Sequence, residues 1–66
     1  MPVINIELAI GQTSEGQKEK LVSRITADAS EITGIAAEKF IMFIHELPFE
    51  NVGVGGKTLK MIRAGR

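Results

Sequence analysis

The chain lacks cysteine and contains a single histidine, His45, among its 66 residues. Without cysteine, no disulfide can form and no Cys/His zinc site can be built. No apolar run approaches 18 residues and no charged-then-apolar leader is present, so we expect no membrane segment and a cytoplasmic protein. Eight basic residues balance eight acidic ones, and this absence of a basic excess argues against nucleic-acid and anionic-membrane partners.

The short length of the chain predicts one domain, residues 1–66, without repeats or linkers. A chain of this size buries only about 60% of its unfolded surface, so its core is marginal. Small domains usually gain stability from disulfides, a metal ion or self-association. Because the composition excludes the first two routes, we expect self-association.

Two strands and one helix are predicted from hydrophobic periodicity. Residues 2–10 alternate with the period of two that is typical of a strand, and residues 40–44 (FIMFI) begin a second strand that continues towards Pro48. This second strand is apolar on both sides, which is typical of a parallel strand in a covered sheet. The connector before it, residues 34–39, is expected to form about one helical turn.

Between the strands, residues 15–33 have helical spacing and Gly34 is a typical helix stop. Ser14 and Gln17 match a capping box, with Thr13 as the rival cap. The expected apolar stripe of the helix is Leu21, Val22, Ile25, Ala29 and Ile32, and its opposite, polar side includes Lys18.

The order strand, helix, strand predicts a β-α-β unit with a parallel two-stranded sheet. The glycine-rich tail after Pro48 predicts a C-terminal β-hairpin or an arm that reaches a neighbouring subunit. The predicted fold class is therefore α/β (α+β). One helix covers only one face of such a sheet, and each large apolar side chain left exposed costs about 1.5–3 kcal/mol. We therefore expect a second copy of the chain to complete the sheet in a homo-oligomer.

Two features of the sequence suggest chemistry but favour simpler interpretations. The segment NVGVGGKT, residues 51–58, resembles the end of a phosphate-binding loop, but Asn51 replaces the first glycine of that motif, so glycine turns are favoured. His45 has no serine or acidic partner in a triad pattern, so an edge or interface position is favoured over catalysis. Glu7 is either a solvated charge or part of a pocket in an oligomer.

Pro2 offers the clearest chemistry in the chain. Its simplest role is to begin a strand, where its missing N–H lies at the end of the ladder. Removal of Met1 would leave Pro2 as a free secondary amine. The α-amine of model peptides has a pKa of about 7.7–8.0, which an apolar pocket or a nearby cation lowers. A neutral amine near pH 7 can accept a proton as general base and return it as general acid.

The chain as a whole resembles the 4-oxalocrotonate tautomerase family, and in particular its small DmpI-like members. The resemblance covers nearly all 66 residues and rests on the Met-Pro start, GQT and QKEKLV, ITG, EKFIMFIHE and ENVGVGGK. It implies an isomerase without cofactor or metal, in which Pro2 interconverts the enol or dienol and keto forms of an unsaturated 2-oxo acid such as 2-hydroxymuconate. It also implies a hexamer built as a trimer of dimers.

The resemblance implies a substrate site that has lost two arginines in this chain. Gln12 and Ile41 stand at the two arginine positions, and Val52 replaces an aromatic residue. Their loss puts specificity for dicarboxylates in question. Lys39, Arg63 from a neighbour's tail and Gln12 itself are the candidate replacements that would bind substrate, through hydrogen bonds or charge.

Two other functions fit the same residues. The assembly could serve as a non-catalytic interaction module, or the same amine could support hydration or dehalogenation of an unsaturated acid. If Met1 is retained, the nitrogen of Pro2 is an amide without a basic lone pair, and none of the amine chemistry is available.

Overall fold

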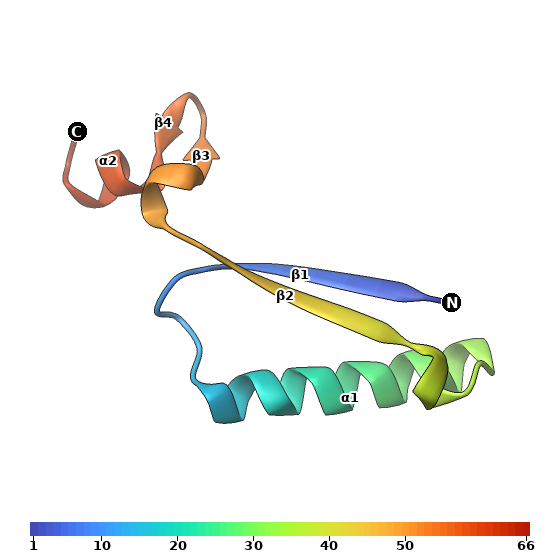
Figure 1. Cartoon of the computed structure of the whole chain (residues 1–66). Helices are drawn as coiled ribbons and strands as arrows, with labels where there is room; N and C mark the ends of the chain where they lie inside the picture. The colour runs from blue at the N-terminus through green and yellow to red at the C-terminus, as the bar shows by residue number, and fades with distance from the viewer.

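The computed structural model describes all residues from Met1 to Arg66. The element order is β1 (Val3–Ala9), α1 (Glu15–Thr33), the 3-10 turn η1 (Ala37–Lys39), β2 (Ile41–Leu47), the 3-10 turn η2 (Phe49–Asn51), β3 (Gly53–Val54), β4 (Lys57–Thr58) and α2 (Leu59–Arg63), as Figure 1 shows.

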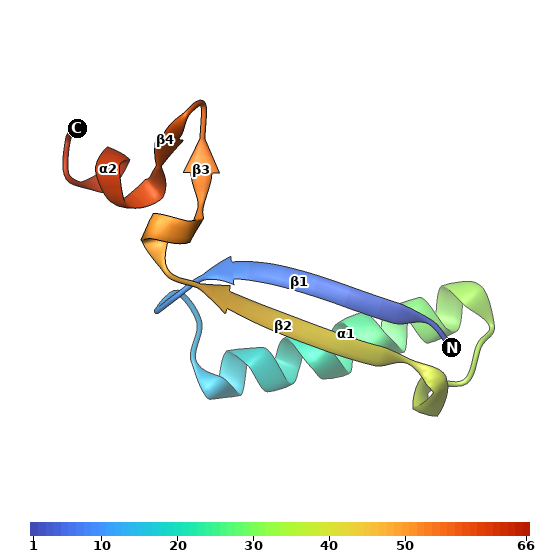
Figure 2. The same cartoon turned by 45° about the horizontal axis from the view of Figure 1, so that its top comes forward.

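β1 and β2 form a parallel two-stranded sheet, in register from the Val3 and Ile41 pair to the Ala9 and Leu47 pair. α1 lies against one side of this sheet (Figure 2). The predicted β-α-β unit, the parallel sheet and the C-terminal hairpin are all confirmed. Two short elements, η2 and α2, were not predicted from the sequence.

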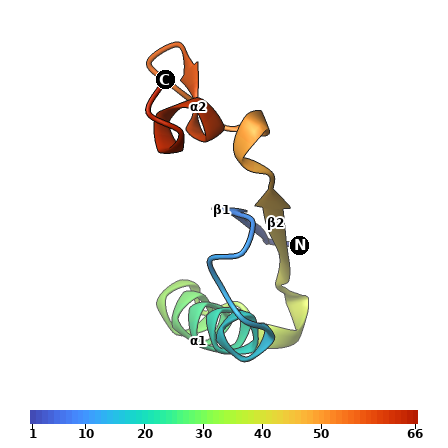
Figure 3. The same cartoon turned by 90° about the vertical axis from the view of Figure 1, so that its left-hand side faces the viewer.

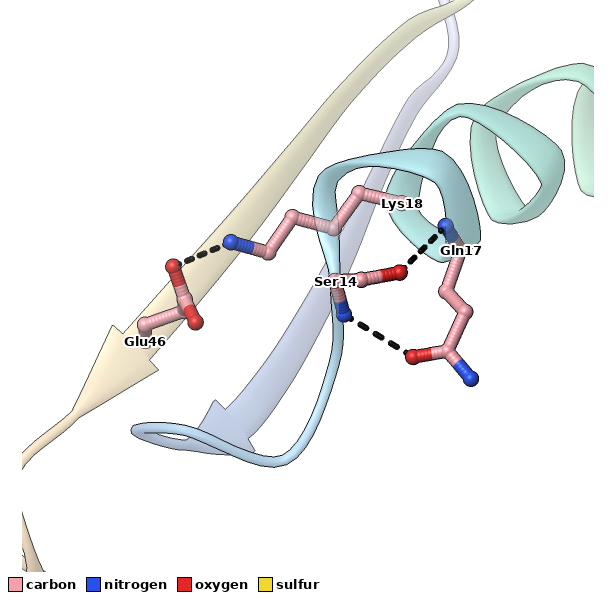
Figure 4. A network of polar contacts seen from close by, with 4 residues as sticks. All are labelled: Ser14, Gln17, Lys18 and Glu46. Atoms are coloured by element: carbon pink, nitrogen blue, oxygen red, sulfur yellow. Dashed lines mark hydrogen bonds and ion pairs between the residues drawn. The ribbon is translucent and has the colours of Figure 1, made fainter.

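The ends of α1 are determined by two local signals. Ser14 Oγ accepts a hydrogen bond from the backbone N–H of Gln17, and Gln17 Oε1 accepts one from the backbone N–H of Ser14 (Figure 4). This is the predicted capping box, which satisfies two N–H groups at the helix start. Gly34 ends the helix at φ 76°, a left-handed conformation that glycine adopts without steric cost.

The side of α1 that faces the sheet differs from the prediction at three positions, one of which is Val22, expected in the apolar stripe but 41% exposed. Lys18, expected on the polar side, reaches across to β2 and forms an ion pair with Glu46 (Figure 4). Ile32, expected in the apolar stripe, is 84% exposed because it lies near the end of the helix. Neither helix combines the length and apolar composition needed to cross a membrane.

The C-terminal arm, residues 48–66, extends away from the end of the sheet (Figures 1 and 3). Its hairpin pairs β3 with β4 through a two-residue turn at Gly55 and Gly56, whose φ values are 61° and 88°. Two successive positive φ angles match the tight turn that a right-twisted hairpin requires. Thr58 then caps α2, since its hydroxyl accepts a hydrogen bond from the N–H of Met61 at 3.1 Å.

The second face of the sheet is uncovered. We call it the open face, and it consists of Val3, Asn5, Glu7, Ala9, Ile41, Phe43, His45 and Leu47, which alternate with the helix-facing residues of both strands. Figure 3 shows α1 on one side of the sheet, and on the other side only the C-terminal arm, which extends away from the end of the strands. Val3 and Phe43 are each 50% exposed, although both are large and apolar.

A single chain is therefore extended, with an unusually large surface. None of the 66 residues is buried, and the accessible surface is 4914 Å², whereas a compact monomer of this mass exposes about 4,100 Å². The radius of gyration is 15.3 Å, against about 11 Å for a compact domain of this length. The single chain is thus more extended than a compact domain of the same length.

The capping box predicts a stability difference between two neighbouring hydroxyls. Ser14→Ala should lower the free energy of unfolding by about 1 kcal/mol, because it removes the acceptor for the Gln17 N–H. The matched control is Thr13→Ala, since the Thr13 hydroxyl is shielded and has no hydrogen-bond partner; its effect should stay within about 0.5 kcal/mol. Urea denaturation of the three proteins at equal concentration measures both values. Equal losses for the two variants would contradict the assignment of Ser14 as the cap.

Candidate functional site

Pro2 lies at the first position of the sheet, immediately before β1. Its carbonyl accepts a hydrogen bond from the backbone N–H of Ile41 at 3.0 Å, so the start of β2 holds the residue in place. Pro2 is half-buried, whereas Met1 is 87% exposed. Because Met1 precedes it, the Pro2 nitrogen is an amide here and becomes an amine only when Met1 is removed. An amine at this position would be held at the start of the sheet, next to Ile41.

Lys39 lies at the same end of the sheet as Pro2. It is the last residue of η1, two positions before Ile41, and its backbone N–H donates to the carbonyl of Ala36 at 3.0 Å. Its side chain is exposed and takes part in no ion pair. Of the predicted substrate-binding residues, it is the one that the fold brings to the Pro2 end.

Gln12, Val52 and Arg63 lie at the other end. Gln12 follows β1, and Val52 and Arg63 belong to the C-terminal arm, which follows β2. Because the strands are parallel, the C-terminal ends of β1 and β2 lie at the same end of the sheet. At this end the backbone N–H of Ile10 donates a hydrogen bond to the carbonyl of Leu47 at 2.8 Å. β1 has seven residues, so the two ends of the sheet lie about 23 Å apart at about 3.3 Å per residue.

At this far end, the C-terminal arm holds its residues in defined positions. The Val52 carbonyl accepts a hydrogen bond from the N–H of Leu59 at 2.7 Å, which ties η2 to the start of α2. The Arg63 guanidinium lies over the ring of Phe49, 4.6 Å from its centroid. Phe49 was not singled out from the sequence, because nothing local links it to a residue 14 positions later. The cation–π contact keeps the Arg63 charge at the surface of the arm.

The predicted site residues therefore do not meet within one chain. Pro2 and Lys39 occupy one end of the sheet, and Gln12, Val52 and Arg63 occupy the other. A single chain also forms no pocket at either end. If these residues act together, the Pro2 end of one copy must lie beside the far end of another.

The other sequence features have structural positions that agree with their simpler interpretations. The glycines of residues 51–58 form the hairpin turn between β3 and β4, and the helix that follows has only five residues. His45 lies on the open face, where its Nε2 is 3.3 Å from Oδ1 of Asn5 on the adjacent strand. The Asn5 contact could not be found from sequence, since it depends on the pairing of residues 40 positions apart.

Comparison with known proteins places these features in a family. A family model described as tautomerase enzyme matches residues 2–62, and thus begins at Pro2. The 2-hydroxymuconate tautomerase of Bacillus subtilis is 37% identical over 59 residues, covering 89% of this chain and 94% of that protein. A 4-oxalocrotonate tautomerase isozyme of Methylibium petroleiphilum superposes with a TM-score of 0.89 at 29% identity, covering 98% of this chain and all of that one. A heterohexameric 4-oxalocrotonate tautomerase of Chloroflexus aurantiacus superposes with a TM-score of 0.85 at 25% identity, covering 96% and 100%. The chain belongs to the tautomerase enzyme family.

Proposed function

We propose that the protein is a tautomerase that interconverts the enol or dienol and keto forms of unsaturated 2-oxo acids such as 2-hydroxymuconate. After Met1 is removed, the Pro2 amine accepts the proton of the enol hydroxyl and delivers a proton to a carbon of the conjugated chain. The product is the conjugated keto acid, and no electron leaves or enters the substrate. The observation that carries the proposal is the position of Pro2, which immediately precedes β1 and begins the family match.

The surroundings of Pro2 suit an amine that works near neutral pH. The hydrogen bond from Ile41 to the Pro2 carbonyl fixes the residue, and the pyrrolidine ring leaves the nitrogen little freedom of direction. Ile41 and Val3, paired in register beside it, supply apolar surface. Lys39 supplies a cation at the same end. Apolar cover and a nearby positive charge both favour the neutral, basic form of an amine.

The substrate site that we propose is built from two copies of the chain. One copy contributes Pro2 and Lys39, and the far end of a second copy contributes Gln12, Val52 and Arg63. Lys39 and Arg63 would then supply one cation on each side of the substrate, which suits the carboxylates of a dicarboxylate. Gln12 adds a neutral hydrogen bond and Val52 an apolar wall. An antiparallel arrangement of two sheets brings opposite ends together in this way.

The same arrangement leads to the proposed assembly, a homo-oligomer and specifically a hexamer formed as a trimer of dimers. The support is the uncovered sheet face, the extended shape of the single chain and the division of the site between its two ends. The heterohexameric relative of Chloroflexus aurantiacus is consistent with it.

The role of Pro2 is tested by Pro2→Ala. The trimmed variant should lose about 10²-fold or more of the ketonisation rate of 2-hydroxymuconate, measured by the change in absorbance, because the primary amine of alanine lacks the fixed direction of the proline nitrogen. Intact mass must first establish that Met1 is absent. The matched control is the parent chain with Met1 retained, which keeps every side chain but blocks the amine and should be equally impaired. If Pro2→Ala and the chain that retains Met1 both react as fast as the trimmed parent, the Pro2 amine is not the catalyst. That result would favour a non-catalytic interaction module.

Self-association is tested by sedimentation of the parent and of Phe43→Lys. The parent should sediment as an oligomer at micromolar concentration, whereas a lysine at the open face should shift it towards smaller species, because a buried unpaired charge is costly. Ser23→Lys, which places the same charge on an exposed position of α1, is the control and should leave the assembly unchanged. A folded parent monomer at micromolar concentration would refute the assembly.

The two-copy site is tested by mixing inactive variants. Pro2→Ala impairs one end of the sheet and Arg63→Ala the other, so each protein alone should be strongly impaired. When the two are unfolded together and refolded, random mixing should restore about a quarter of the parent activity, since one site in four then combines an intact Pro2 with an intact Arg63. Refolding each variant separately before mixing is the control. Activity no higher than the average of the two variants would show that the residues do not share a site.

A further inference from the structure

The Arg63 guanidinium is held in place but has no anionic partner. Its central carbon lies over the ring of Phe49, 4.6 Å from the ring centroid. The only ion pair of the chain joins Lys18 of α1 to Glu46 of β2. No side-chain hydrogen bond of the C-terminal arm involves the guanidinium either. Because a guanidinium has donors and no acceptor, the N–H groups of Arg63 are free to bind an acceptor from outside the chain.

Phe49 itself is fixed by the fold of the C-terminal arm. It is the first residue of η2 and is half-buried. Its carbonyl accepts a hydrogen bond from the N–H of Val52 at 3.4 Å, and the Val52 carbonyl accepts one from the N–H of Leu59 at 2.7 Å. These two bonds tie η2 to the first residue of α2, the helix that carries Arg63. The ring and the guanidinium therefore come from two elements that the backbone holds together.

The side-chain charge around Arg63 is positive. Residues 48–66 contain four basic residues and one acidic residue, whereas residues 1–47 contain four basic and seven acidic residues. The balanced charge of the whole chain therefore hides a basic C-terminal arm. Glu50, the acidic residue of the arm, forms no ion pair. A positive surface attracts anions, and a guanidinium binds a carboxylate through two parallel hydrogen bonds. A carboxylate is therefore the group that fits the free donors of Arg63.

We propose that Phe49 is a positioning residue, whose ring holds the Arg63 guanidinium ready to bind a carboxylate of the substrate. This inference rests on the proposed function, in which Arg63 contributes to the substrate site. A free arginine side chain has many rotamers, and restricting them on binding lowers affinity. The ring of Phe49 restricts them beforehand, because a guanidinium stacks on an aromatic face and keeps its N–H groups available. Phe49 therefore raises the affinity for substrate and takes no part in proton transfer at Pro2.

The experiment is a double-mutant cycle on the ketonisation of 2-hydroxymuconate by the proteins without Met1, with kcat and KM measured separately. Phe49→Leu stays apolar but loses the ring. It should raise KM about two- to fivefold, the range for an exposed cation–π contact, and change kcat by less than about twofold. Phe49→Tyr keeps a ring and should keep the parent KM. In the Arg63→Ala background, Phe49→Leu should have no further effect on KM, since it acts through Arg63.

The matched control is Lys60→Ala, which removes a cation of the same helix that makes no cation–π contact. Combined with Phe49→Leu, its effect on KM should be additive, because the two residues act independently. Sedimentation of every variant measures whether the parent assembly is kept.

Two results for KM would overturn this inference: a parent-like KM for Phe49→Leu, or an equal rise in KM in the parent and Arg63→Ala backgrounds. A loss of kcat or of assembly in Phe49→Leu would also overturn it, because the ring would then serve the structure of the arm. If Phe49→Leu fails to fold, Phe49→Met, which is apolar and also lacks a ring, decides the same question.

Failure of this inference can be told from failure of the proposed function. An Arg63→Ala protein with the parent KM would remove Arg63 from the proposed substrate site, and this inference with it. If Pro2→Ala is inactive and Arg63→Ala has a raised KM, but Phe49→Leu reacts like the parent, the proposed function stands and only the role of Phe49 is wrong.

Discussion

The structure depends on the limited cover that one helix gives to a two-stranded parallel sheet. α1 lies on one face of the sheet, and the open face keeps large apolar residues such as Val3 and Phe43 half-exposed. Burial of apolar surface is the main favourable term in folding. A chain without disulfides that buries none of its residues has little else to stabilise it. This limited burial is the physical reason for proposing that several copies of the chain build one larger core together.

The parallel pairing of β1 and β2 also determines where chemistry can occur. It places both strand starts at one end of the sheet, next to Pro2, and sends Gln12 and the C-terminal arm to the other end. In the proposed function, each end carries only part of the site: Pro2 and Lys39 lie at one end, and Val52 and Arg63 lie at the other. Self-association would thus provide both stability and a complete site, since the same contacts that cover the sheet bring opposite ends together.

The polar residues of the open face have a different consequence. Asn5, Glu7 and His45 interrupt a surface that apolar residues would cover more favourably. Buried charged pairs seldom add net stability, but they penalise contacts that leave a charge unpaired. If further copies cover the open face, an arrangement that leaves the Glu7 carboxylate unpaired would therefore be disfavoured.

Local patterns in the sequence were sufficient to predict the main elements. The alternation of residues 2–10, the Ser14 and Gln17 box, the Gly34 stop and the turn glycines each act over a few neighbouring positions, and the structure confirms all of them. The apolar character of both sides of β2 also showed that one helix could not cover the sheet. Pro2 stood out for a chemical reason, because proline in the second position can become an amine.

The tertiary structure decided the relations between distant residues. The ion pair of Lys18 with Glu46 spans 28 positions and the contact of Asn5 with His45 spans 40, and both depend on which residues of β1, α1 and β2 come to lie together. The separation of Pro2 from Arg63 likewise follows from the parallel register and the direction of the arm. Sequence periodicity specifies which side of an element is apolar, but it contains no information about the register or the partner that meets that side, since those are set by packing across the whole chain.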